Sequence, residues 1–219
     1  DLTISTKTDP LPFSTDISTY TSIENTNVIS ITSGNSVNTG LLTLPFSFNI
    51  QGTALTTFVA YSYGYIQLGN ASTMTTVPTY TYTPFDNNYI ISAMGTDLTT
   101  ATGGGTIAYV TTGTTPNRVF TIQWTNHRFY YEASGGVLNF QVKLYETSNK
   151  IELVYGNCTS YPSYYPYVGV KGTTLLHCRR TATGSWNNTS LNTTYNNTTY
   201  DNNTTTYFLN GIVKLKELN

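Results

Sequence analysis

Charged residues are scarce in this sequence. Only 10% of its 219 residues are Asp, Glu, Lys or Arg, whereas an ordinary soluble domain has about 25%. The formal net charge is −1, which argues against nucleic-acid binding because that function needs a basic surface. Thr, Ser, Asn and Tyr must therefore supply the polar surface, as is common in secreted and cell-surface proteins.

Long apolar runs and helical periodicity are also missing. No run reaches the roughly 18 apolar residues that mark a transmembrane helix, so no membrane span is expected. Hydrophobic residues nevertheless make up 38% of the chain and aromatic residues 14%. This is enough to build a sizeable core, and it argues against global disorder.

Apolar residues instead alternate with polar ones, most clearly over residues 118–156. Phe120, Ile122 and Trp124 form one such set, and Ile151 and Leu153 repeat the same period of two. This period is typical of sheet strands with one face in the core. With further short runs at hairpin spacing, it predicts an all-β fold, a two-layer antiparallel β-sandwich with jelly-roll-like connections.

The chain divides into an extension and one body. Residues 1–12 contain a short alternating run followed by Pro10 and Pro12, which interrupt it because proline has no N–H to donate. Residues 13–219 are predicted to form a single domain, since all-β domains of this size are often undivided. Within it, residues 181–206 form an Asn- and Thr-rich surface tract.

Familiar catalytic motifs are absent. The only histidines, His127 and His177, lie far apart, and no nucleophile elbow, zinc-protease motif or P-loop occurs. Cys158 and His177 could form a nucleophile–base pair. A disulfide between Cys158 and Cys178 is the simpler interpretation for a surface protein, and two buried free thiols are the alternative.

The acidic residues offer no clear catalytic pair. Glycoside hydrolysis needs two carboxyl groups aimed at one cleft, and the candidates are Glu132, Glu146 and Glu152. Glu146 and Glu152 flank a short turn, where solvated charges are expected in any case. We therefore predict that the protein is not an enzyme.

No cofactor is expected, although calcium is an alternative. Asp86, Asp97 and Asp201 have Asn residues in their segments or nearby, and calcium prefers oxygen ligands of this kind. None of the three has the spacing of an EF-hand.

Two surface features are candidates for contact or modification. Tyr161, Tyr164, Tyr165 and Tyr167 crowd one segment, and tyrosine offers a flat face and a hydroxyl to a sugar or a neighbouring subunit. Simple coverage of one end of the sandwich is the alternative. N-x-S/T acceptors for glycosylation occur at Asn70, Asn157, Asn187, Asn188, Asn192, Asn196, Asn197, Asn202 and Asn203.

The extension suggests a mode of assembly. Leu2 and Ile4 alternate with Thr3 and Ser5, and Thr6 completes the run. A short alternating segment outside a complete domain suits strand addition to a neighbour's sheet edge. Such head-to-tail contacts do not close and so produce filaments. Pairing within its own sheet, or disorder, is the alternative for this segment.

Three blocks of the sequence carry a resemblance to a known family. They read LPFSFNIQGTALTTFVAYSYGYIQLG, NRVFTIQWTNHRFYY and NFQVKLYETSNKIELVYG. In order and spacing they resemble a β-sandwich domain of secreted and cell-surface, adhesin-like proteins of Bacteroidota, and more distantly nidogen-type extracellular domains. The resemblance covers residues 13–215 and implies an extracellular location. Of the acidic pair that such domains carry after their second block, only Asp97 is present here.

These observations predict an extracellular, cell-surface protein with a structural or adhesive function. The first interpretation is a subunit of a homopolymeric filament that assembles by strand addition. The alternative is a carbohydrate-binding or adhesin module that meets glycans or a host surface through its Tyr-rich loops.

Overall fold

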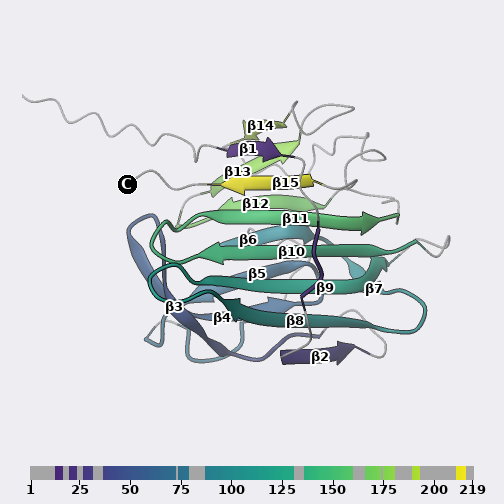
Figure 1. Cartoon of the computed structure of the whole chain (residues 1–219), viewed down its shortest axis with the longest axis horizontal. Coiled ribbons are helices and arrows are strands. Elements are labelled where there is room, and N and C mark those ends of the chain that lie inside the picture. Colours follow the sequence, from purple (N-terminus) through teal and green to yellow (C-terminus); the bar gives the residue numbers. More distant parts are fainter. Residues whose placement is uncertain are drawn as a thin grey trace, which may run out of the picture.

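The structure, a computed structural model, describes most of the body of the chain. The described residues are 13–16, 20–23, 27–31, 37–72, 74–78, 87–130, 136–159, 166–173, 175–180, 189–192 and 211–215. Within them the chain forms strands and no helix. The strands lie in two antiparallel sheets that pack face to face (Figure 1). The predicted all-β, two-layer sandwich is therefore confirmed.

The larger sheet has eight strands in the order β1-β15-β11-β10-β9-β8-β2, with β7 pairing on β9 outside this path. Their bounds are β1 Phe13–Asp16, β2 Asn27–Ile31, β7 Leu98–Thr100, β8 Gly105–Thr112, β9 Val119–Phe129, β10 Leu138–Tyr145, β11 Ile151–Cys158 and β15 Gly211–Leu215.

The smaller sheet has seven strands in the order β14-β13-β12-β6-β5-β4-β3. Their bounds are β3 Leu42–Ile50, β4 Thr53–Tyr61, β5 Tyr65–Gly69, β6 Ile90–Gly95, β12 Tyr167–Lys171, β13 Leu175–Arg180 and β14 Thr189–Asn192. The chain changes sheet between β2 and β3, β6 and β7, β11 and β12, and β14 and β15, which gives the jelly-roll-like connectivity.

The predicted meander over residues 118–156 forms the centre of the larger sheet. It consists of β9, β10 and β11, which are neighbours in the sheet and pair in antiparallel register. Val142 lies opposite Ile122 on one side and Leu153 on the other. All three side chains are fully buried, because the period of two directs each of them to the same face of the sheet.

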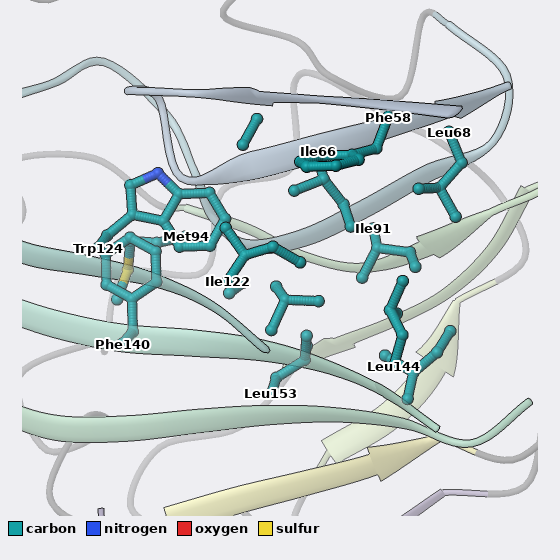
Figure 2. Packing of buried hydrophobic residues seen from close by; sticks show 14 of the residues in the cluster. Phe58, Ile66, Leu68, Ile91, Met94, Ile122, Trp124, Phe140, Leu144 and Leu153 are labelled. Atoms are coloured by element: carbon teal, nitrogen blue, oxygen red, sulfur yellow. The ribbon is translucent and has the colours of Figure 1, made fainter. Parts of the chain in front are cut away.

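The core lies between the two sheets, and Figure 2 shows its side chains converging from both layers. Trp124 stacks on Phe140 with ring centroids 5.1 Å apart. Two hydrogen bonds also tie the sheets together: Trp124 Nε1 donates to the Tyr61 carbonyl at 2.8 Å, and the Tyr155 hydroxyl donates to the Ala93 carbonyl at 2.6 Å. These polar atoms are buried, so the bonds fix how the layers sit against each other.

A second, smaller cluster forms on the smaller sheet. Tyr61, Tyr63 and Tyr65 pack there with Met74, and all three tyrosines are almost completely buried. The Tyr61 ring stacks on Tyr65 at 4.6 Å, and its hydroxyl donates to the Pro78 carbonyl at 2.9 Å. The segment after β5 therefore covers tyrosines that would otherwise be exposed.

Candidate interaction surface

Strand addition requires a free sheet edge, and the described sandwich has four. The larger sheet ends at β1 and β2, and the smaller sheet ends at β14 and β3. Each edge strand leaves one row of main-chain N–H and C=O groups without a neighbouring strand. These edges are the candidate interaction surface, and their surroundings differ.

A short segment links the two edges of the larger sheet across its outer face. Residues 20–23, which we call the strap, lie between β1 and β2 in the chain, and their partners are on β9, β10 and β11. Figure 1 shows this part of the chain passing in front of the sheet on its way to β2. The strap therefore connects opposite edges of one sheet.

Two glutamines hold the strap. Gln123 on β9 is 2% exposed and Gln141 on β10 is fully buried. The Ile23 N–H donates to Gln123 Oε1 at 2.9 Å, and Gln141 Nε2 donates to the Thr21 carbonyl at 2.8 Å. Gln141 Nε2 also donates to Gln123 Oε1 at 2.7 Å. Buried amides of this kind are stable only when hydrogen-bonded, so the strap completes the outer face of the sheet.

Tyr20 begins the strap and presses against the backbone of β11. A Cβ at Gly156 would lie 2.7 Å from Cγ of the Tyr20 ring, so only glycine leaves room for the ring there. Burial raises the pKa of the Tyr20 hydroxyl to about 12. The Tyr20 ring is thus part of the packed structure.

Replacing Gly156 with valine is expected to dislodge the strap. The added side chain overlaps the Tyr20 ring, and such overpacking costs about 1–3 kcal/mol of unfolding free energy. The measurements are chemical denaturation and amide hydrogen exchange at Ile23, whose N–H should lose protection when it leaves Gln123.

The control for Gly156→Val is the same substitution in a Tyr20→Ala background. If the Tyr20 ring is the obstacle, the valine should be less destabilising there, and the two changes should not be additive. An equal loss of stability in both backgrounds would show that the clash with Tyr20 is not the cause.

The β3 edge is obstructed. Pro45 lies within β3 and has no N–H, and the pairing of β3 with β4 shifts register between Thr43 and Phe48. The Arg118 guanidinium donates to the Pro45 carbonyl at 2.7 Å and pairs with the Glu146 carboxylate at 2.5 Å. Hydrogen bonds from Arg118 hold the pKa of Glu146 below its usual value. Proline, an irregular register and a fixed cation are features that discourage strand pairing.

Among the described residues, the β2 edge has no such protection. Its sequence NVISI contains neither proline nor charge. Val28 is 40% exposed, one of the few large hydrophobic side chains that the described residues leave in solvent. β2 is therefore the least guarded edge of the larger sheet.

Of the candidate catalytic carboxylates, Glu146 and Glu152 lie in the described residues. Glu146 is paired with Arg118, as above. Glu152 is only 5% exposed, so the prediction that it is a solvated turn charge was wrong. The Tyr145 hydroxyl donates to Glu152 at 2.5 Å and the Lys150 ammonium lies 2.9 Å from it, which makes its burial possible. Glu132 and the side chain of His177 lie outside the described residues.

The predicted disulfide between Cys158 and Cys178 is not present in the structure. Cys158 is a free, buried thiol whose Sγ lies 3.5 Å from the Asn139 carbonyl, and burial raises its pKa to about 12. The two cysteines lie on β11 and β13, which belong to opposite sheets. The Cys158 thiol is directed instead to the backbone of the neighbouring strand β10.

The described residues contain no cluster of three or more His, Cys, Asp or Glu side chains that could hold a metal ion. Asp97 lies in them, just before β7, whereas Asp86 and Asp201 lie outside them. The part of the chain that the structure describes also has no helix long and apolar enough to cross a membrane.

Of the Tyr-rich segment, only Tyr167 is described. It is partly buried, packs against the tyrosine cluster of the smaller sheet, and accepts a hydrogen bond from Ser92 on its carbonyl at 2.6 Å. Tyr161, Tyr164 and Tyr165 lie outside the described residues, as do residues 1–12 with Leu2, Thr3, Ile4, Ser5 and Thr6.

Two of the glycosylation acceptors have described side chains. Asn157 is exposed at the end of β11, and the Asn70 side chain accepts hydrogen bonds from the N–H and hydroxyl of Ser72. Asn192 lies at the end of β14, with its side chain undescribed. The remaining acceptors lie outside the described residues, namely Asn187, Asn188, Asn196, Asn197, Asn202 and Asn203.

The strap and the two glutamines that hold it were not predicted from the sequence. Gln123 and Gln141 occupy positions that alternate with core residues, so they read as ordinary solvent-facing side chains. The signal that could have found the strap is weak: Gly156 within a strand indicates that something approaches the backbone closely.

Comparison with known proteins gives one match. A family model described as "NIDO related" matches residues 11–217. No curated protein matches the sequence. No solved structure matches it either.

Proposed function

Because this chain belongs to the NIDO-related family, a nidogen-type extracellular family, we propose that it is a non-enzymatic structural subunit of a surface filament. Copies assemble head to tail when residues 2–6 of one add a strand to a sheet edge of the next. Adhesion or matrix formation is the biological result. The resemblance to Bacteroidota adhesins remains a prediction that agrees with this function.

The observation that carries the proposal is the position of the two edges of the larger sheet. The extension leads directly into β1, which is one edge, and β2 is the opposite edge. The extension of one copy can therefore pair with the β2 edge of the next copy. Because these two surfaces differ, the contact is heterologous. Such contacts repeat without closing and produce a fibre.

The chain length argues against the extension returning to its own β2. Six strand-to-strand steps separate β1 from β2, and at about 4.8 Å each the sheet is roughly 29 Å wide. Seven residues lie between Thr6 and Phe13 when Phe13 is counted, and they span about 25 Å at most. A second copy can offer its β2 edge without this limit.

The charge of the chain permits such an assembly. A large net charge keeps proteins apart by mutual repulsion. The net charge here is −1 and only 10% of residues are charged, so neighbouring copies repel each other little.

Deleting residues 1–10 is expected to abolish assembly while the sandwich stays folded. The described strands begin at Phe13, so the deletion removes none of them. Negative-stain microscopy should show filaments for the full chain and none for the truncated chain. Circular dichroism should show the same β signal for both.

The matched control replaces Leu2 and Ile4 with aspartate and leaves the length unchanged. It should also prevent filaments, because the apolar side of the donor strand is lost. A truncated protein that still forms filaments would refute assembly through the extension.

The carbohydrate-binding alternative has little support among the described residues. Tyr167, the member of the Tyr-rich segment that the structure describes, is partly buried and packs against the tyrosine cluster. Strong, specific signals on a glycan array from the truncated monomer would favour that alternative.

A further inference from the structure

We infer that the acceptor for residues 2–6 of a neighbouring copy is the free edge of β2, Asn27–Ile31. This inference rests on the proposed function and names the partner surface that assembly would use. The incoming strand would extend the eight-stranded sheet beyond β2.

The four edges differ in how well they can accept a strand. β3 is obstructed by Pro45, its register shift and Arg118. β1 is four residues long and carries Asp16. β14 is also only four residues long. β2 has five residues, none of them charged and none proline, so it lacks the devices by which proteins protect their edges.

The main chain of β2 directs some of its N–H and C=O groups away from β8, where an added strand could bond to them. Asn27 lies opposite Tyr109 on β8, and its side-chain amide donates to the Tyr109 carbonyl at 3.3 Å, so that carbonyl faces β2. In an antiparallel pair, alternate residues direct both N–H and C=O to the partner strand. Positions 27, 29 and 31 therefore bond to β8, and the N–H and C=O groups of Val28 and Ser30 point away from the sheet.

The two faces of β2 match the alternation of the extension. The register places position 29 opposite Ile107, which is fully buried in the core, and position 27 opposite Tyr109, which packs against it. Odd positions of β2 are thus on the core side of the sheet. In an added strand, Leu2 and Ile4 can lie on this side, with Thr3 and Ser5 facing solvent.

The strap fixes the start of β2. Ile23 is bonded to Gln123 four residues before Asn27, so β2 is tied at one end to the middle of the sheet. An acceptor held in place loses less conformational entropy when a strand binds.

The test uses the protein lacking residues 1–10 and a synthetic peptide of residues 1–9. Peptide binding is measured by calorimetry, and amide hydrogen exchange is followed along β2. We expect exchange at Val28 and Ser30 to slow at least about tenfold on saturation. We expect Val28→Pro, which removes one outward N–H, to weaken peptide binding about fivefold to tenfold. Val28→Thr keeps the N–H and should bind like the parent.

The possible outcomes distinguish the inference that β2 is the acceptor from the proposed assembly through residues 2–6. Peptide binding and filaments with unchanged exchange at Val28 and Ser30 would place the acceptor at another edge and leave the proposed function intact. No peptide binding, together with filaments from the truncated protein, would overturn both. If Val28→Pro does not fold by circular dichroism, the exchange experiment on the parent decides alone.

Discussion

Replacing Trp124 with alanine is expected to lower the free energy of unfolding by about 3–5 kcal/mol. Trp124 is fully buried, stacks on Phe140 and donates to the Tyr61 carbonyl of the opposite sheet at 2.8 Å. The substitution removes the largest side chain of the core and one of the two hydrogen bonds that the Tyr61 carbonyl accepts, the other coming from the Gly64 N–H. The melting temperature should fall by roughly 10 °C for a chain of this size.

The control is Trp124→Phe, which keeps an aromatic ring but not the indole N–H. It should cost about 1–3 kcal/mol, because the hydrogen bond between the sheets is lost and the smaller ring leaves part of the indole volume unfilled. Urea denaturation of the three proteins gives both values. A loss below about 1 kcal/mol for Trp124→Ala would mean that Trp124 does not hold the two sheets together.

Acidification from about pH 6.5 to pH 4 is expected to remove about 3 kcal/mol of stability through His127 alone. Burial lowers the pKa of His127 from 6.5 to about 4 in the folded protein. In this range the unfolded chain binds a proton that the folded chain does not, so lower pH favours unfolding. Above pH 6.5 the histidine is neutral in both states and its contribution is fully present. Below about pH 4 both states are protonated, and the loss is complete.

The structure explains why the folded protein excludes this proton. The His127 ring is fully buried, with Nδ1 3.1 Å from the Thr125 carbonyl, and Nε2 has no hydrogen-bond partner. His127→Leu removes the titrating group and keeps the volume similar. Between pH 7 and pH 4, the free energy of unfolding of the parent should fall by about 3 kcal/mol more than that of the variant. Curves that stay parallel would contradict the assignment.

The sequence predicted the part of the fold that depends on local alternation. Residues 118–156 form β9, β10 and β11 because their apolar residues repeat every second position. Phe140, Val142 and Leu144 all reach the core as that period requires. The family blocks also led to the nidogen-type resemblance, which the match to residues 11–217 confirms.

Contacts between distant segments could not be predicted in this way. Glu152 looked solvated because its partners, Tyr145 and Lys150, come together only when the turn between β10 and β11 closes. Met74 lies in a Thr-rich segment without a clear alternating pattern, yet it packs on the tyrosines of the smaller sheet. Each of these contacts depends on how strands pair in space, which a pattern along one strand does not report.

The candidate surface was predicted only in part. The alternation of Leu2 and Ile4 suggested a donor strand, but the sequence could not identify an acceptor. That requires the order of strands in the sheet, which places β2 at an edge and shows β3 to be obstructed by Arg118 from a distant turn.

The pairing of β1 with β15 has a consequence for the time course of folding. Phe13 lies opposite Leu215, so β1 must wait for β15, which is synthesised much later. Closing so long a loop is entropically unfavourable, and folds rich in such distant contacts form slowly. During translation the amino-terminal segment therefore leaves the ribosome long before its place in the sheet exists. The outer edge of the larger sheet is therefore completed only after residues 211–215 have been synthesised.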